Sequence, residues 1–333
     1  MDDNDRTSLH RTDIDRTDIL AAHRRIAGDV RRTPLWRVRG AEFGVPVEEL
    51  WLKLEHLQVG GSFKARGMFN RMRAQPIPAA GVVIASGGNA GIAVACAARA
   101  LGVRCEVFVP EISSPTKRAT LAQLGAVVTV SGAAYSHALD ASLARQAATG
   151  ALLMHAYDQT EVAAGAGTLA LEVEEDAGLP DRALVSVGGG GLIAGVAAWF
   201  ESRCRVEGLE PRGAPTLARA RQAGEPVDVE VSGLAADSLG ARRLGRIAWA
   251  VTQRHVGASH VLADADIRRA QLALWQQCRL AVEPAAALPL AALMGGEIRP
   301  EPSERVLLIL CGANFDPAVL DAGAESSGRP VAH

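Results

Sequence analysis

The 333-residue sequence has few aromatic residues, no excess of either charge and no long apolar run. Aromatic side chains make up 4% of the chain, so the stacking surfaces that single-stranded nucleic acid needs are missing. The formal net charge of −2 gives no general attraction to nucleic acid or to anionic lipid. No window approaches the ~18 apolar residues of a membrane-spanning helix. These deficits predict a globular protein without a nucleic-acid or membrane partner.

Cysteine is also scarce, and its spacing excludes two common structural sites. The five cysteines, at 96, 105, 204, 278 and 311, are odd in number and show no C-x-x-C pair, which argues against a disulfide framework or a structural zinc site. The charged start of the chain has no apolar region behind it, unlike a secretory signal. We therefore predict reduced thiols in a cytoplasmic protein, with residues 1–17 as a flexible polar tail.

Lysine is rare among the 35 basic side chains, because only Lys53, Lys64 and Lys117 occur and arginine supplies the rest. Chemistry that needs a deprotonatable side-chain amine therefore has three candidates. Lys64 follows the glycine turn 60–63 and precedes a predicted helix over 65–73, where the helix dipole disfavours an ammonium group. A lowered pKa would free this amine for Schiff-base chemistry, and the alternative is a solvated lysine in a loop.

Short apolar strands alternate with helices along the chain. We expect strands at 82–85, 105–109, 126–130, 183–187, 205–209 and 305–310, and helices at 90–101, 115–124 and 265–280. A first helix is expected over 19–26 with Asp18 as its cap. This alternation is typical of α/β folds with parallel sheets flanked by helices. We expect a large domain of residues 18–80 and 158–333, interrupted by a small domain of residues 81–157 that closes on the substrate.

Two glycine-rich turns connect predicted strands to helices. Gly188, Gly189, Gly190 and Gly191 precede a helix that starts at Leu192, so backbone amides and the helix dipole form an anion cradle, unless this is merely a tight turn. The turn 86–90 suits a carboxylate in the same way, unless it is a helix cap. A phosphate cradle and a reactive lysine together suggest pyridoxal phosphate. Cys311, at the end of the last strand, is either a core thiol or a partner of the ring nitrogen.

With these features the chain resembles the fold type II pyridoxal-phosphate enzymes, and within them the serine/threonine dehydratases. The segment 60–67, Gly-Gly-Ser-Phe-Lys-Ala-Arg-Gly, is similar to the cofactor-lysine segment of that family. Further segments are similar and occur along the chain in the same order as in that family, at 32–35, 53–55, 115–117, 158, 165–168, 188–191, 282–284 and 311–314. The resemblance implies a two-domain α/β fold like that of the tryptophan synthase β-subunit, with parallel or mixed sheets and the smaller domain inserted in the larger.

The resemblance also implies roles for individual residues. Lys64 would hold the cofactor covalently and then remove the Cα proton of the substrate, while Phe63 would pack on the pyridine face. Asn89 would donate to the ring hydroxyl, Cys311 would face the ring nitrogen, and Glu283 would add a further cofactor contact. The backbone would bind the cofactor phosphate at Gly188, Gly189, Gly190, Gly191 and Leu192, and the substrate carboxylate would lie against Ser86, Gly88, Asn89 and Ala90.

Two positions depart from the family pattern. Gly87 stands where related serine racemases place a serine as a second acid, so we expect weak racemisation. The family's cation position corresponds to Glu210 and Ala214, but the next ligand position holds Thr216 instead of a carboxylate. Hard divalent cations prefer several charged oxygens, so this pattern predicts at most a weak metal site.

The predicted reaction is the elimination of water from L-threonine or L-serine, giving 2-oxobutyrate or pyruvate and ammonia. Three alternatives remain open at this point. The substrate could be a rarer β-hydroxy amino acid, such as 3-hydroxyaspartate or an intermediate of compatible-solute breakdown. The chain could instead be a β-replacement synthase of the cysteine-synthase kind, or a cofactor-binding sensor without turnover. A homodimer is expected, because dimers are common in the similar family and among soluble oligomers.

Overall fold

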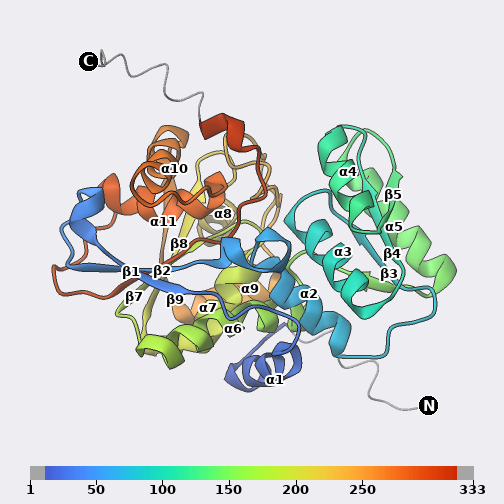
Figure 1. The fold of residues 1–333 in the computed structure, drawn as a ribbon, viewed down its shortest axis with the longest axis horizontal. Coiled ribbons are helices and arrows are strands. Elements are labelled where there is room, and N and C mark those ends of the chain that lie inside the picture. Colours follow the sequence, from blue (N-terminus) through green and yellow to red (C-terminus); the bar gives the residue numbers. More distant parts are fainter. Residues whose placement is uncertain (1–11, 321–333) are drawn as a thin grey trace.

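The computed structural model describes residues 12–320, which form two sheets lying side by side (Figure 1). The larger sheet has six strands, in the order β1 (Leu35–Arg39), β2 (Glu49–Lys53), β10 (Val306–Ile309), β7 (Arg182–Ser186), β8 (Arg205–Pro211) and β9 (Val256–Leu262). The smaller sheet has four, in the order β5 (Val127–Val130), β4 (Cys105–Val109), β3 (Val82–Ala85) and β6 (Leu152–Met154). Only β1 and β2 pair antiparallel among these strands. The predicted α/β class, with one mixed and one parallel sheet, is confirmed.

Helices cover both sheets, as parallel strands require. Around the larger sheet, α10 and α11 lie on one side and α1, α6 and α7 on the other (Figure 1). The helices of the larger-sheet part are α1 (Arg16–Ile26), α2 (Lys64–Arg73), α6 (Thr160–Ala177), α7 (Gly191–Phe200), α8 (Thr216–Ala223), α9 (Arg246–His255), α10 (Asp264–Cys278) and α11 (Pro284–Met294). Those of the smaller-sheet part are α3 (Asn89–Leu101), α4 (Pro115–Gln123) and α5 (Tyr135–Thr149).

The first helix starts three residues earlier than the sequence suggested. Asp15, and not Asp18, is its N-cap: the Asp15 side chain accepts hydrogen bonds from the amides of Thr17 and Asp18, and the Asp18 carboxylate accepts one from the Asp15 amide. This reciprocal pair is a capping box, which satisfies amides that the helix leaves unpaired. The predicted tail therefore ends before Arg16, and residues 1–11 of it lie outside the described residues.

Helix α6 fixes two other helices relative to each other. It crosses α2 so closely that a Cβ on Gly165 would lie 2.7 Å from the Cα of Gly67. It crosses α7 equally closely, where a Cβ on Gly195 would lie 2.8 Å from the Cα of Gly167. Because α2 begins with Lys64 and α7 follows the glycine run, these contacts set the distance between the lysine and the glycine turn.

A buried ionic cluster adds a second tie between α2 and α6. The Arg66 guanidinium donates to both carboxylate oxygens of Glu55 and to both of Glu172, and all three side chains are buried. Lys53 donates to Glu172 at 2.6 Å and to the Thr33 carbonyl at 2.8 Å. Two cations thus face two anions, so the cluster is neutral, as burial of charge demands.

The described residues contain no helix that is long and apolar enough to cross a membrane. The five cysteines are all free thiols, and four of them are buried.

Candidate active site

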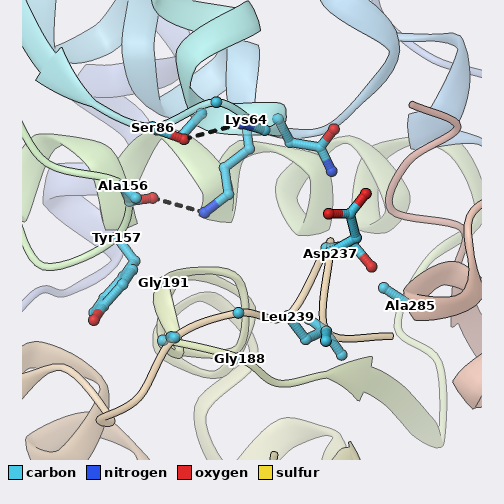
Figure 2. A pocket seen from close by; sticks show the side chains of 18 of the residues that line it. Lys64, Ser86, Ala156, Tyr157, Gly188, Gly191, Asp237, Leu239 and Ala285 are labelled. Atoms are coloured by element: carbon cyan, nitrogen blue, oxygen red, sulfur yellow. Dashed lines mark hydrogen bonds between the residues drawn. The ribbon is translucent and has the colours of Figure 1, made fainter. Parts of the chain in front are cut away.

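A pocket of about 490 Å³ lies between the two sheets, at the carboxyl ends of β3, β7 and β10. Ligands in open parallel sheets bind at these strand ends. Figure 2 shows Lys64 and Ser86 on one wall and the turn from Gly188 to Gly191 on the opposite one. The pocket brings together predicted site residues from five segments: Phe63, Lys64, Ser86, Gly88, Asn89, Ala90, Gly188, Gly189, Gly190, Gly191, Leu192, Glu283 and Cys311. Glu210 and Ala214 are not among them.

The amine of Lys64 lies inside this pocket at the first position of α2. Its Nζ donates a 2.6 Å hydrogen bond to the carbonyl oxygen of Ala156 (Figure 2) and lies 5.0 Å from the centre of the Phe63 ring. Burial lowers the pKa of Lys64 to about 8, although the nearby Cys311 and Glu283 act in the opposite direction. A useful fraction of the amine is therefore unprotonated and nucleophilic near neutral pH.

The glycine turn after β7 presents a row of backbone amides to the pocket. Within residues 12–320, no protein acceptor takes a backbone hydrogen bond from the amides of 188–192. The carbonyl groups, by contrast, are paired: Gly188 O accepts from the Thr216 hydroxyl and Gly189 O from the Gly245 amide. Amides that are left free at the start of a helix form an anion site, since the helix dipole adds positive potential there.

Neighbouring side chains pack closely against the glycines of the turn and leave little room for a Cβ. A Cβ on Gly188 would lie 3.2 Å from Leu239, and one on Gly189 would fall inside the Tyr157 ring. Gly190 has a φ of +89°, which favours glycine, and a Cβ there would also meet Leu244 at 2.8 Å. The turn is therefore both tight and suited to an anion, because these close contacts hold its amides in place.

The turn after β3 is not closed by a side-chain cap. Gly88 is the N-cap of α3, and Ser86 Oγ accepts a 3.4 Å hydrogen bond from the Gly88 amide. The turn 86–90 thus contains the N-cap of α3, and the cap is made by the backbone at Gly88 and not by a side chain. The first amides of α3 stay available for a carboxylate at the pocket wall.

A hydrogen-bonded chain connects Asn89 to two residues of the C-terminal segment. Asn89 Nδ2 donates to both carboxylate oxygens of Glu283 at 2.9 Å, and Asn89 Oδ1 accepts from Asn314 Nδ2 at 2.7 Å. Burial raises the pKa of Glu283 to about 7, although the Asn89 amide and the Lys64 ammonium lower it. This arrangement orients the Asn89 amide and places a carboxyl that titrates near neutrality beside the lysine. Asn314 was not predicted as a separate site residue.

The thiol of Cys311 is buried at the pocket wall. Burial raises its pKa well above the usual value, and the carboxylate of Glu283 acts in the same direction. The Cys311 carbonyl accepts a 3.0 Å hydrogen bond from the Phe63 amide, which ties the end of β10 to the segment before Lys64. The group is therefore a neutral thiol.

Glu210 lies outside the pocket and caps a helix. Its carboxylate accepts hydrogen bonds from the amides of Leu217 and Ala218 at 2.6 and 2.8 Å, and from the Ser259 hydroxyl at 2.8 Å. Ala214 is fully buried and offers no side-chain oxygen. The described part of the chain holds no cluster of three or more histidine, cysteine, aspartate or glutamate side chains suited to a metal. The two residues considered for a cation therefore do not form a candidate metal site, because protein donors occupy the carboxylate.

Sequence reasoning missed one whole wall of the pocket. Residues 236–243 form it, and in this loop Asp237 makes a 2.5 Å ion pair with Lys117 of α4, across the pocket. Arg242 belongs to the same wall, and Tyr135 and Tyr157 line the pocket from other segments. No motif marks the loop, since it approaches the site only through the tertiary fold.

Comparison with known proteins agrees with this geometry. The family model described as pyridoxal-phosphate dependent enzyme matches residues 26–312. The chain belongs to this family, in its fold type II serine/threonine dehydratase branch. It is 35% identical to an L-threonine ammonia-lyase of Geobacter sulfurreducens, with 93% of this chain and 79% of that protein covered. It is 35% identical to a phenylserine dehydratase of Ralstonia pickettii, with 94% and 97% covered. The structure of maize serine racemase is similar, with a TM-score of 0.86, 31% identity, and 93% and 97% covered.

Pyridoxal phosphate is therefore the cofactor, and the chain is an enzyme of the serine/threonine dehydratase type. The pocket fits this group. It offers an amine of lowered pKa for the aldehyde, a row of free amides for the phosphate and a neutral thiol beside them.

Proposed function

We propose that this enzyme eliminates water from L-threonine or L-serine and releases 2-oxobutyrate or pyruvate together with ammonia. The observation that carries the proposal is the amine of Lys64, which faces a turn of free amides across one pocket. The similarity to an L-threonine ammonia-lyase over 93% of the chain supports the same substrate class.

In this proposal the cofactor supplies an electron sink for the Cα carbanion. Lys64 would hold the cofactor through its amine and would take the Cα proton on Nζ, which its lowered pKa permits. The free amides of 188–192 would bind the cofactor phosphate. Phe63 would contact the cofactor ring, and Asn89, oriented by Glu283, would donate to the ring hydroxyl.

The remaining residues act on the substrate and on the ring nitrogen. Ser86, Gly88 and Ala90 belong to the turn whose free amides bind the substrate carboxylate. Cys311 keeps its proton, so it offers the ring nitrogen no full charge. A weaker electron sink suits rapid loss of the β-hydroxyl. Gly87 has no side chain, so this position supplies no acid that would return a proton to the opposite face.

A substrate with a second carboxylate is the other candidate. Lys117 of α4 and Arg242 of the loop 236–243 both line the pocket, and both are cations. They would suit 3-hydroxyaspartate or an anionic intermediate of compatible-solute breakdown. The similarity to a phenylserine dehydratase supports an aromatic β-hydroxy amino acid as another member of the same substrate class. A β-replacement synthase and a sensor without turnover are set aside, since the chain is a dehydratase-type enzyme.

We further propose that residues 81–157 act as a small domain that closes on the substrate through the turn 86–90, and that the enzyme is a cytoplasmic homodimer. Small-angle scattering with and without a substrate analogue would test the closure. Sedimentation of the holoenzyme would test the dimer.

The test of the reaction is release of 2-oxo acid from L-threonine, L-serine, threo-3-hydroxyaspartate and 3-phenylserine, assayed in parallel. Release from threonine or serine supports the proposal. Release only from hydroxyaspartate or phenylserine overturns the substrate and keeps the reaction class. Lys64→Ala should abolish both the release and the visible absorption band of the bound cofactor, whereas Lys53→Arg should keep the band.

A further inference from the structure

The short turn between β6 and α6 contacts the site at two points and a neighbouring helix at a third. The Ala156 carbonyl accepts the hydrogen bond of the Lys64 amine. The Tyr157 ring lies against the glycine turn, as Figure 2 shows. Asp158 Oδ1 accepts a 3.1 Å hydrogen bond from the amide of Ile247 in the first turn of α9. One turn thus touches the amine, the predicted phosphate loop and a helix behind that loop.

Tyr157 fills the space that two glycines leave. A Cβ on Gly189 would collide with carbons of the Tyr157 ring, and one on Gly191 would lie 3.0 Å from the Tyr157 Cβ. The Tyr157 hydroxyl donates a 3.2 Å hydrogen bond to the carbonyl of Arg243. Burial raises the pKa of Tyr157 to about 12, so the hydroxyl stays a donor throughout the neutral range.

The backbone on either side of Tyr157 is held by its neighbours. His155 Nδ1 accepts hydrogen bonds from the amides of Tyr157 at 3.3 Å and Asp158 at 3.0 Å. The His155 and Tyr157 rings meet edge to face, with 4.7 Å between their centres. Gln159 closes the turn, because its amide oxygen accepts from the His155 amide and its nitrogen donates to the Leu153 carbonyl.

We propose that Tyr157 is a positioning residue for the phosphate-binding loop. Its ring supports Gly189 and Gly191, so that the amides of 188–192 keep the directions needed for a phosphate. The inference rests on the proposed assignment of residues 188–192 to the cofactor phosphate. A rigid aromatic ring suits this task, since it loses little conformational freedom and packs with defined geometry. The flexible alternative, an aliphatic side chain, would leave the glycines free to change their backbone angles.

The test compares Tyr157→Phe with Tyr157→Leu in protein from which the cofactor has been removed. Pyridoxal phosphate is titrated back, and affinity is read from the visible absorption band. Phosphorus NMR of the bound phosphate reports the loop geometry directly. We expect Tyr157→Phe to bind within about twofold of wild type and Tyr157→Leu about tenfold more weakly, with a shifted phosphorus signal. Tyr135→Leu is the matched control, because that ring lines the same pocket but is not among the atoms nearest to a Cβ on any glycine of the turn.

An unchanged affinity and phosphorus signal in Tyr157→Leu would overturn the inference, and so would equal losses in the Phe and Leu variants. Gly189→Ala approaches the same contact from the other side and should shift the phosphorus signal if Tyr157→Leu does not fold. A wrong assignment of the phosphate site would give a different result. If residues 188–192 do not bind the cofactor phosphate, Gly190→Val would leave the affinity for pyridoxal phosphate unchanged. An error in the proposed substrate would not affect this test, since cofactor binding is measured without turnover.

Discussion

Replacing Lys64 by methionine should make the cofactor-free protein more stable at neutral pH while it abolishes covalent cofactor binding. Burial lowers the pKa of Lys64 from 10.5 to about 8. The unfolded chain therefore binds the proton more tightly than the folded chain does. Below pH 8 the folded state has to bury an ammonium group, and this shift costs about 3 kcal/mol of stability. Methionine has similar length and carries no charge.

The pH dependence follows from the sign of the shift. Between pH 8 and pH 10.5 the folded protein loses its proton before the unfolded chain does, so wild-type stability rises with pH in that window. The cost of the lysine falls to about 1 kcal/mol at pH 10. The variant also leaves the Ala156 carbonyl without its donor, which costs about 1 kcal/mol at every pH. The variant should thus be about 2 kcal/mol more stable than wild type at pH 7 and nearly equal to it at pH 10.

Urea unfolding of both cofactor-free proteins, measured side by side from pH 6.5 to 10, provides the assay. Titrations of groups that Lys64 does not influence cancel in the difference between the two proteins, whereas Glu283, whose pKa the Lys64 ammonium lowers, adds a change near pH 7. A difference that does not change with pH would refute the reasoning, because Lys64 would then have its ordinary pKa in the folded state. Lys64→Arg is the control, since it retains a charge at every pH and should be less stable than wild type throughout.

Three further outcomes are expected. Arg66→Met should lower the free energy of unfolding by about 3–5 kcal/mol in urea titrations, because it leaves the buried carboxylate of Glu55 without its cation. A loss below 1 kcal/mol would contradict this. Asp237→Asn should change stability by less than about 1 kcal/mol, since Asp237 is 71% exposed, but should lower KM for 3-hydroxyaspartate relative to threonine by releasing Lys117. Unchanged relative KM values would count against that role. Glu283→Gln should remove the fall in kcat/KM below pH 7, because burial raises the pKa of Glu283 to about 7 and protonation loosens its hold on the Asn89 amide. Persistence of that fall in the variant would assign it to another group.

The sequence alone was sufficient for the fold class and for part of the pocket, since every residue predicted to contact cofactor or substrate lines it. Strands at 82–85 and 105–109 match β3 and β4 residue for residue, because short β-branched and apolar runs bounded by glycine or proline are clear signals. The glycine run and the lysine after a glycine turn were identifiable because each requires a rare residue at a fixed place. The helix α5 and the edge strands β1 and β9 were missed, since their half-exposed patterns carry little periodic signal.

Tertiary contacts alone decided which residues complete the site. The loop 236–243 and Tyr157 have no motif, and they reach the pocket through the packing of α6, α7 and α9. Glu210 fitted a cation position in sequence, but the folded chain uses its carboxylate to cap α8. Sequence specifies residue types and local conformation, and it therefore identified the lysine and the glycines as candidate site residues that line one pocket. Burial and distance between remote segments set the pKa of Lys64 and the neighbours of each glycine, and these exist only in the folded chain.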